Sequence, residues 1–312
     1  MSAPIRIGTR GSALALAQTG QIADRVRRAS GGEVEIVTVT TEGDTSRASL
    51  SSLGGTGVFA SALREALLAG ECDLVVHSLK DLPTAPAEGL RIGAVPKRAD
   101  ARDALIARDG LTLATLPEGA RVGTGSPRRV AQLRSVRPDL VLSDIRGNID
   151  TRLGFVHGGS LDAVVLAAAG LGRLGRLDAA TELFELSAHP SAPGQGALAI
   201  EVRERVPAAL AGVLQGLEHA STRLAATAER AVLARLEAGC AAPVGATALI
   251  DSDLLLLTAT VYSIDGSRSL SASHGLVLEG PPAARIELAT ELGHRAADEL
   301  LEAGAAELAP LR

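Results

Sequence analysis

The chain is nearly without aromatic residues: its 312 residues include no Trp, one Tyr and three Phe. Its cores must therefore be built from Leu, Val, Ile and Ala, and it lacks the rings on which nucleic-acid-binding proteins stack bases. A net charge of −5 likewise gives no general attraction to nucleic acid or to an anionic membrane. We therefore expect no nucleic-acid partner.

Cysteines and long apolar runs are also scarce. Cys72 and Cys240 are too few for a disulfide framework or a zinc site, and the six histidines show no ligand spacing, so we predict no metal. No apolar run approaches the roughly 18 residues needed to span a bilayer, and the N-terminus does not resemble a signal peptide. These absences favour a cytoplasmic protein with no membrane partner.

The residues that are present predict alternating strands and helices over the first 200 positions. Apolar spacing predicts helices over 12–28 and 59–69, and a strand–helix–strand unit implies a parallel sheet. After Pro243 the pattern changes to three antiparallel strands and a long helix from Pro282 to Ala303. The short apolar runs that predict strands before this change are 5–7, 34–39, 74–76, 91–95, 104–107, 121–123, 140–142, 163–166 and 197–202.

This pattern predicts an α/β fold of two lobes flanking a cleft, followed by an α+β domain with a three-stranded antiparallel sheet. Polar crossings near residues 96 and 196 suggest that the second lobe is inserted into the first. Domain 1 then comprises 1–96 and 197–216, domain 2 comprises 97–196, and domain 3 comprises 217–312.

Polar and basic residues follow several predicted strands, at the position where open α/β sheets bind ligands. Arg10 and Ser12 follow the first strand, and Ser78, Lys80 and Asp81 follow the strand at 74–76. Only two of the 31 basic residues are lysines, so a compact charge is favoured at Lys80. An ordinary helix cap and a structural ion pair would also explain these residues.

A stronger signal for an anion lies at Arg128 and Arg129, in the first turn of a predicted helix. Cations there oppose the helix dipole and destabilise the helix unless an anion binds. Residues 121–152 contain seven arginines and only three acids. Because arginine binds carboxylates bidentately, this region predicts a ligand with several carboxylates.

Two residues have the chemistry for catalysis. Cys240 can form a covalent bond to an electrophilic carbon, and Asp81 can stabilise a cation or carry a proton. A solute-binding protein would explain the arginines but would give no role to Asp81 or Cys240. A cysteine acyl transferase would need a histidine near Cys240, and the nearest in sequence, His219, lies in no recognisable motif.

Six motifs, in order along nearly the whole chain, resemble those of the porphobilinogen deaminase family. They are Gly8-Thr-Arg-Gly-Ser12, His77-Ser-Leu-Lys-Asp-Leu-Pro83, Val122-Gly-Thr-Gly-Ser-Pro-Arg-Arg129, Ile145-Arg-Gly-Asn148, Pro193-Gly-Gln-Gly196 and Leu236-Glu-Ala-Gly-Cys240. The resemblance implies a hydroxymethylbilane synthase, a transferase that adds four porphobilinogen molecules to a dipyrromethane primer, losing ammonia each time. It also implies two lobes similar to periplasmic solute-binding proteins, and we expect a monomer.

The resemblance also implies roles for individual residues. One dipyrromethane cofactor would be joined by a thioether to Cys240, and Asp81, expected to be a buried acid, would stabilise electron-poor pyrrole species. Residues that match cofactor-binding positions are Ser78, Lys80, Asp81, Thr124, Ser126, Arg128, Arg129, Arg146 and Arg152. Residues that match catalytic or substrate-binding positions are Asp81, Arg10, Ser12, Phe59, Arg146, Arg152, Arg173 and Gln195.

Three positions depart from the family pattern. Thr56 and Glu42 stand where many members have a lysine and an arginine, and both fall in a polar stretch expected to be a mobile flap. Gly125 replaces a frequent serine but keeps its backbone N–H. These departures put the electrostatic contribution of the flap in doubt, but they leave the thioether and the carboxylate unaffected.

Overall fold

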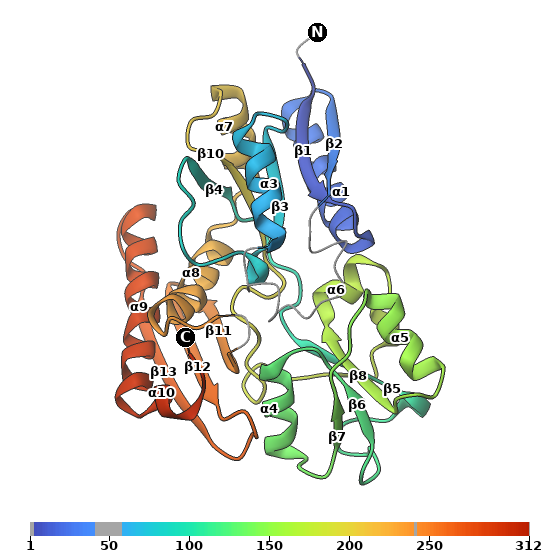
Figure 1. Ribbon diagram of the computed structural model, residues 1–312. Coiled ribbons are helices and arrows are strands. Elements are labelled where there is room, and N and C mark those ends of the chain that lie inside the picture. The colour runs from blue at the N-terminus through green and yellow to red at the C-terminus, as the bar shows by residue number, and fades with distance from the viewer. Residues whose placement is uncertain (1–2, 41–57, 240–241, 312) are drawn as a thin grey trace. The chain divides into compact units, whose positions relative to one another are not determined.

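The computed structural model describes residues 3–40, 58–239 and 242–311, and the side chains of residues 58 and 59 are not among the described parts (Figure 1). The chain divides into two compact units. Unit 1 is Met1–Ala99 with Ala197–Arg223, and unit 2 is Asp100–Gly196 with Leu224–Arg312. Glu42, Thr56, the expected flap and Cys240 lie outside the described residues. The three predicted domains and the cleft stay predictions.

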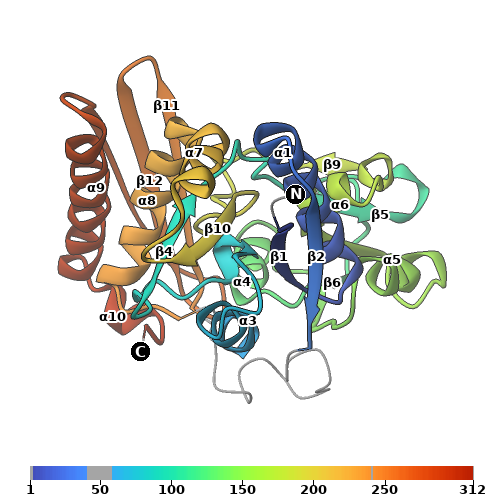
Figure 2. The ribbon, with the colours of Figure 1, turned by 90° about the horizontal axis from the view of Figure 1, so that it is seen from above.

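Unit 1 is built on a five-stranded sheet in the order β2-β1-β3-β10-β4, in which β10 alone runs antiparallel to its neighbours. Helices α1 (Ala13–Ser30) and α7 (Ala208–Leu217) pack on one face, and α3 (Val58–Leu68) packs on the other (Figure 2). The strands are β1 (Ile5–Arg10), β2 (Val34–Val39), β3 (Leu74–Ser78), β4 (Leu90–Ala94) and β10 (Leu198–Arg203).

The first sheet of unit 2 repeats this topology in the order β7-β6-β8-β5-β9, with β5 antiparallel to both neighbours. Helix α4 (Pro127–Val136) packs on one face, while α5 (Ile149–His157) and α6 (Ala168–Arg173) pack on the other. The strands are β5 (Asp103–Ala107), β6 (Arg121–Gly123), β7 (Val141–Ser143), β8 (Ala163–Ala167) and β9 (Glu182–Leu183). Single 3₁₀ turns occur at Arg108–Gly110 and Leu177–Ala179.

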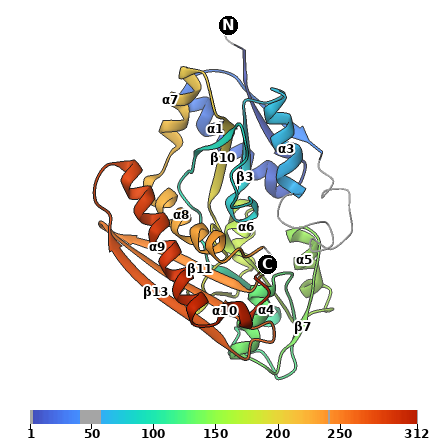
Figure 3. The ribbon, with the colours of Figure 1, turned by 60° about the vertical axis from the view of Figure 1, so that its left-hand side comes forward.

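The second sheet of unit 2 is the predicted antiparallel one, in the order β11-β12-β13. Helix α9 (Pro282–Glu302) lies along one face of this sheet (Figure 3), where the unit 2 part of α8 (Ala220–Arg235) and α10 (Ala305–Leu308) complete an aliphatic core. The strands are β11 (Val244–Asp251), β12 (Leu254–Tyr262) and β13 (Ser269–Val277).

The predicted α/β class with a C-terminal three-stranded antiparallel sheet is confirmed, but some details were wrong. Strand β1 continues through Gly8, where a Cβ would lie 2.8 Å from the side chain of Val75, so this glycine serves close packing and does not end the strand. Apolar spacing predicts a helix over 221–238, but α8 ends at Arg235, because Glu237 adopts a left-handed backbone with φ of 52°. No described helix is both long and apolar enough to cross a bilayer.

Candidate active site

In unit 1 the predicted site residues lie where the parallel strands β1 and β3 end. Arg10 is the last residue of β1, and Ser12 caps α1 by accepting a hydrogen bond from the Ala15 N–H at 3.3 Å. Ser78 ends β3, and its Oγ accepts a hydrogen bond from Gln18 Nε2 at 3.0 Å. Because β1 and β3 are adjacent and parallel, their carboxyl ends share one edge of the sheet. The structure therefore brings these residues together.

Lys80 and Asp81 follow on a single 3₁₀ turn, η1 (Leu79–Asp81). The expectation that Asp81 is buried was wrong, because its side chain is exposed. The flanking Leu79 and Leu82 are buried instead, and they fix the turn so that the residues between them face outward. A carboxylate held at the surface of a rigid turn is accessible to a ligand.

Behind this edge lies a buried charged cluster that the sequence analysis missed. Glu201, on β10, accepts hydrogen bonds from Arg64 Nη2 at 2.9 Å and pairs with His77 Nε2 at 3.2 Å. Burial alone would raise the pKa of Glu201, but hydrogen bonds from His77 and Arg64, together with their charges, outweigh it and lower the pKa. His77 is thus a satisfied strand residue, as its position suggested.

In unit 2 the turn after β6 leads into α4 through a serine cap. Thr124 is buried, and Ser126 caps α4 by accepting a hydrogen bond from the Arg129 N–H at 3.5 Å. A Cβ at Gly125 would lie 2.8 Å from the carbonyl oxygen of Ile145, so the glycine permits a close approach of the two backbone segments. The turn is therefore packed directly against the segment that carries Arg146.

The two arginines of this helix are held by an acid of the chain itself. Asp103, the first residue of β5, is 1% exposed and lies 2.9 Å from Arg128 Nη1 and 2.7 Å from Arg129 Nη2. Gln195 is fully buried and donates hydrogen bonds to Asp103 and to the Ala101 carbonyl oxygen. Because β5 runs antiparallel to β8, Asp103 lies opposite Ala167, at the edge where β8 ends.

Further arginines lie near this pair. Burial lowers the pKa of Arg152, and the positive charges of Arg129 and Arg146 lower it further, against an opposing effect of Asp144. Arg146 is exposed and pairs with Asp144 at 3.0 Å. Burial also lowers the pKa of Arg173 to about 10, and this side chain donates a hydrogen bond to the Gly196 carbonyl oxygen at 2.7 Å.

This cluster fits a ligand with several carboxylates. One buried carboxylate, Asp103, faces the two permanent charges of Arg128 and Arg129, and the charge of Arg129 also acts on a third arginine, Arg152. The Nε atoms of Arg128 and Arg129 are buried and have no hydrogen-bond partner among the described residues. Unpaired buried donors destabilise a protein, so an arriving carboxylate would relieve both the charge excess and the missing hydrogen bonds.

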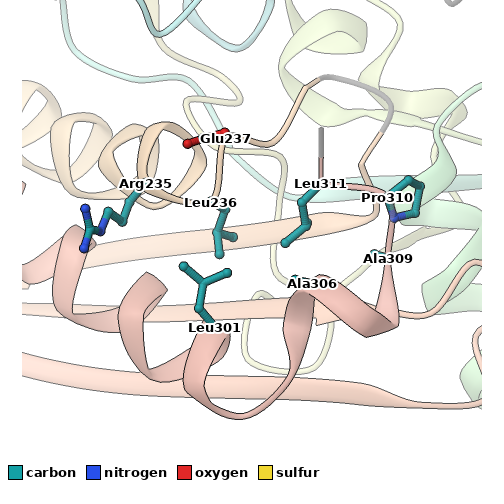
Figure 4. A pocket seen from close by; sticks show the side chains of 8 residues that line it. All are labelled: Arg235, Leu236, Glu237, Leu301, Ala306, Ala309, Pro310 and Leu311. Carbon is teal, nitrogen blue, oxygen red and sulfur yellow. The ribbon is translucent and has the colours of Figure 1, made fainter.

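The segment that precedes Cys240 forms one wall of a pocket of about 500 Å³ (Figure 4). Its one arginine, Arg235, already pairs with Asp298 at 2.6 Å, so this mostly apolar pocket does not suit a polycarboxylate. The residues that line it are Arg235, Leu236, Glu237, Leu301, Ala306, Ala309, Pro310 and Leu311. Cys240 and the side chain of Phe59 lie outside the described parts of the chain.

The contacts of His219 and the burial of Cys72 indicate structural roles for both residues. The Nδ1 atom of His219 lies 2.9 Å from Thr222 Oγ1 and accepts a hydrogen bond from the Thr222 N–H, which places the ring at the start of α8. Cys72 is a free, fully buried thiol, and desolvation raises its pKa to about 11, as expected of a small apolar core residue.

Known proteins match the chain along almost its whole length. The family model described as "Porphobilinogen deaminase, dipyromethane cofactor binding domain" matches residues 5–210, and "Porphobilinogen deaminase, C-terminal domain" matches residues 223–302. The porphobilinogen deaminase of Leifsonia xyli is 66% identical over 99% of this chain and 95% of its own length. That of Thermobifida fusca is 53% identical over 98% and 95%.

Solved structures of periplasmic binding proteins match more remotely. The methionine binding protein MetQ is 14% identical, with a TM-score of 0.43 over 68% of this chain and 89% of that one. An arginine-specific periplasmic binding protein of Salmonella typhimurium is 15% identical, with a TM-score of 0.40 over 69% and 92%. Likenesses this remote carry no argument about function.

Proposed function

The chain belongs to the porphobilinogen deaminase family, and we propose on that premise how its own residues divide the work of the reaction. The activity is that of hydroxymethylbilane synthase, a transferase of tetrapyrrole biosynthesis, and porphobilinogen is the substrate of this family. When bound, the dipyrromethane cofactor supplies the primer that four porphobilinogen units extend, with loss of ammonia at each addition.

The arginine cluster of unit 2 holds the carboxylates of the cofactor in this proposal. The observation that carries it is the excess of buried guanidinium charge around Asp103, with the unpartnered Nε atoms of Arg128 and Arg129. Each pyrrole ring bears an acetate and a propionate. The carboxylates of the growing chain would therefore offset the excess positive charge of the arginine cluster. Within unit 2, Arg146, Arg152 and the Thr124–Ser126 turn would complete the set, and the thiol of Cys240 would form the thioether. Ser78 and Lys80 of unit 1 match further cofactor-binding positions of the family.

Asp81, with Arg10 and Ser12 beside it on the same sheet edge, receives the incoming substrate. Loss of ammonia leaves an electron-poor carbon, and an exposed carboxylate on a fixed turn stabilises the positive charge that develops there. Arg173 binds a substrate carboxylate, which would offset the desolvation of its guanidinium. Gln195 is fully buried, so we assign it to holding Asp103 and Arg129 and not to substrate contact.

The decisive measurement combines intact-protein mass with turnover. Asp81→Ala should carry the dipyrromethane adduct and keep the unfolding temperature of the parent, since the side chain is exposed, yet lose at least 10²-fold in turnover. Cys240→Ser is the control that should lack the adduct mass altogether. Parent-like turnover in Asp81→Ala would refute the role of the carboxylate, and an adduct on Cys240→Ser would refute the thioether.

We also propose that the protein acts as a monomer in the cytoplasm. The support is that Cys72 is a buried free thiol and that the chain contains a single further cysteine, a pattern typical of reducing compartments.

A further inference from the structure

We propose that Asp103 is the positioning residue of cofactor loading: its carboxylate aligns Arg128 and Arg129 before the dipyrromethane arrives. The inference rests on the proposed function, because it assumes that these two arginines bind cofactor carboxylates. None of the six sequence motifs contains Asp103, and its negative charge would repel the carboxylates of the cofactor, so it is not itself a cofactor ligand.

The geometry fixes Arg129 from two sides. Its Nη2 donates to Asp103 Oδ1 at 2.7 Å, and its Nη1 donates to the Val165 carbonyl oxygen at 3.1 Å. Gln195 Nε2 donates to the same Asp103 oxygen at 2.8 Å and thereby holds the carboxylate in place. A free arginine side chain loses rotamer entropy when it is immobilised, so a guanidinium held in advance loses less when it binds a carboxylate.

Arg128 extends the network to the C-terminal sheet. Its Nη1 lies 2.9 Å from Asp103 Oδ2 and donates to Gln132 Oε1 at 2.6 Å. The Gln132 amide in turn donates to Tyr262 Oη on β12 at 3.2 Å. Both sheets of unit 2 are thus linked to one carboxylate, and the C-terminal part of the chain is the part that bears Cys240.

Charge explains why the carboxylate must be in the protein. Without Asp103, Arg128 and Arg129 would be buried without the carboxylate that they share, and a protein awaiting its cofactor would be strongly destabilised. With Asp103, the cluster is stable enough to fold but keeps net positive charge. Asp103 therefore supports the empty state while leaving room for the cofactor carboxylates.

The test measures how fast the cofactor-free full chain acquires the adduct mass on incubation with porphobilinogen. We expect Asp103→Asn to load at least tenfold more slowly than the parent. Asp103→Glu, which keeps the charge, should load faster than Asp103→Asn when the two have equal unfolding temperatures. The matched control is Asp162→Asn, because Asp162 also pairs with two arginines of unit 2, Arg108 at 3.0 Å and Arg121 at 3.3 Å, and it should load like the parent.

The variant Arg129→Gln distinguishes a failure of this inference from a failure of the proposed function. Slow loading of Arg129→Gln with parent-like loading of folded Asp103→Asn would overturn the inference and leave the proposed function intact. Parent-like loading of Arg129→Gln would refute the proposed function itself. Equal loading of Asp103→Asn and Asp103→Glu at equal stability would also overturn the positioning role.

A second variant keeps the test decisive if Asp103→Asn does not fold. The double variant Asp103→Asn/Arg128→Gln removes one cation together with the anion, so it should fold. It should still load several-fold more slowly than Arg128→Gln alone, because Arg129 has lost its anchor. Loading at the rate of Arg128→Gln would overturn the proposal.

Discussion

Each unit contains one buried carboxylate between two cationic side chains, and both carboxylates lie on the fourth, antiparallel strand of sheets with the same strand order. In unit 1, Glu201 on β10 lies between Arg64 and His77. In unit 2, Asp103 on β5 lies between Arg128 and Arg129. The two clusters differ in charge, because a histidine can be neutral whereas two arginines cannot.

This difference in charge distinguishes a structural cluster, in unit 1, from a ligand-binding cluster, in unit 2. Glu201 and Arg64 balance each other, so the cluster of unit 1 needs no further ion. Asp103 balances only one of its two arginines, and Arg152 adds more positive charge nearby. The buried cluster of unit 1 is therefore balanced in charge, whereas the cluster of unit 2 keeps a positive charge and can bind an anion.

The largest predicted effect that tests this comparison is a loss of stability. Glu201→Gln leaves Arg64 largely buried without its partner, so we expect a loss of about 3 kcal/mol in the free energy of unfolding, measured by urea titration. The folded fraction should still load cofactor at the parental rate. Loading as slow as that expected for Asp103→Asn would show that the two clusters do not differ in role.

A smaller effect concerns binding of a simple polycarboxylate. Citrate should raise the unfolding temperature of the cofactor-free protein by a few degrees, since a ligand of the folded state stabilises it by mass action. Arg152→Gln should remove at least half of that gain, whereas Arg235→Gln, an exposed arginine paired with Asp298, should keep it. An equal gain in all three proteins would indicate nonspecific anion binding.

The smallest effect is a dependence on pH. The folded pKa of Glu201 lies below the ordinary value of 4.5, so the stability it contributes is complete above that pH and is lost as the pH falls through the folded pKa. The stability difference between the parent and Glu201→Gln should shrink as the pH falls below 4.5. A difference that grows as the pH falls below 4.5 would contradict the lowered pKa.

Local sequence patterns predicted most strands and helices because each depends on residues close in the sequence. The 34–39 and 121–123 strands match the structure without change. The exposed position of Asp81 was missed, because it depends on how Leu79 and Leu82 are anchored in the core. The hydrophobic pattern of the sequence does not show that Asp103 and Glu201 lie on antiparallel strands.

The direction of these two strands explains why neither Asp103 nor Glu201 was predicted to lie in a charged cluster. Asp103 meets Arg129 only because β5 runs opposite to β8, and Glu201 meets His77 only because β10 runs opposite to β3. Strand direction is a property of the whole sheet. A signal did exist for Glu201, which interrupts an apolar run within β10, where an ionisable side chain needs a partner. Asp103 stands at the first position of β5 and gives no such signal.

The place of β10 between β3 and β4 also affects the order in which the nascent chain can fold. Until residues 198–203 have left the ribosome, β3 and β4 each lack a neighbour and expose an open edge. The five strands of the other α/β sheet are all synthesised before that point, within residues 103–183. At 5–20 residues per second, the N-terminal strands wait several seconds with unpaired backbone groups, a window in which a chaperone would be expected to act.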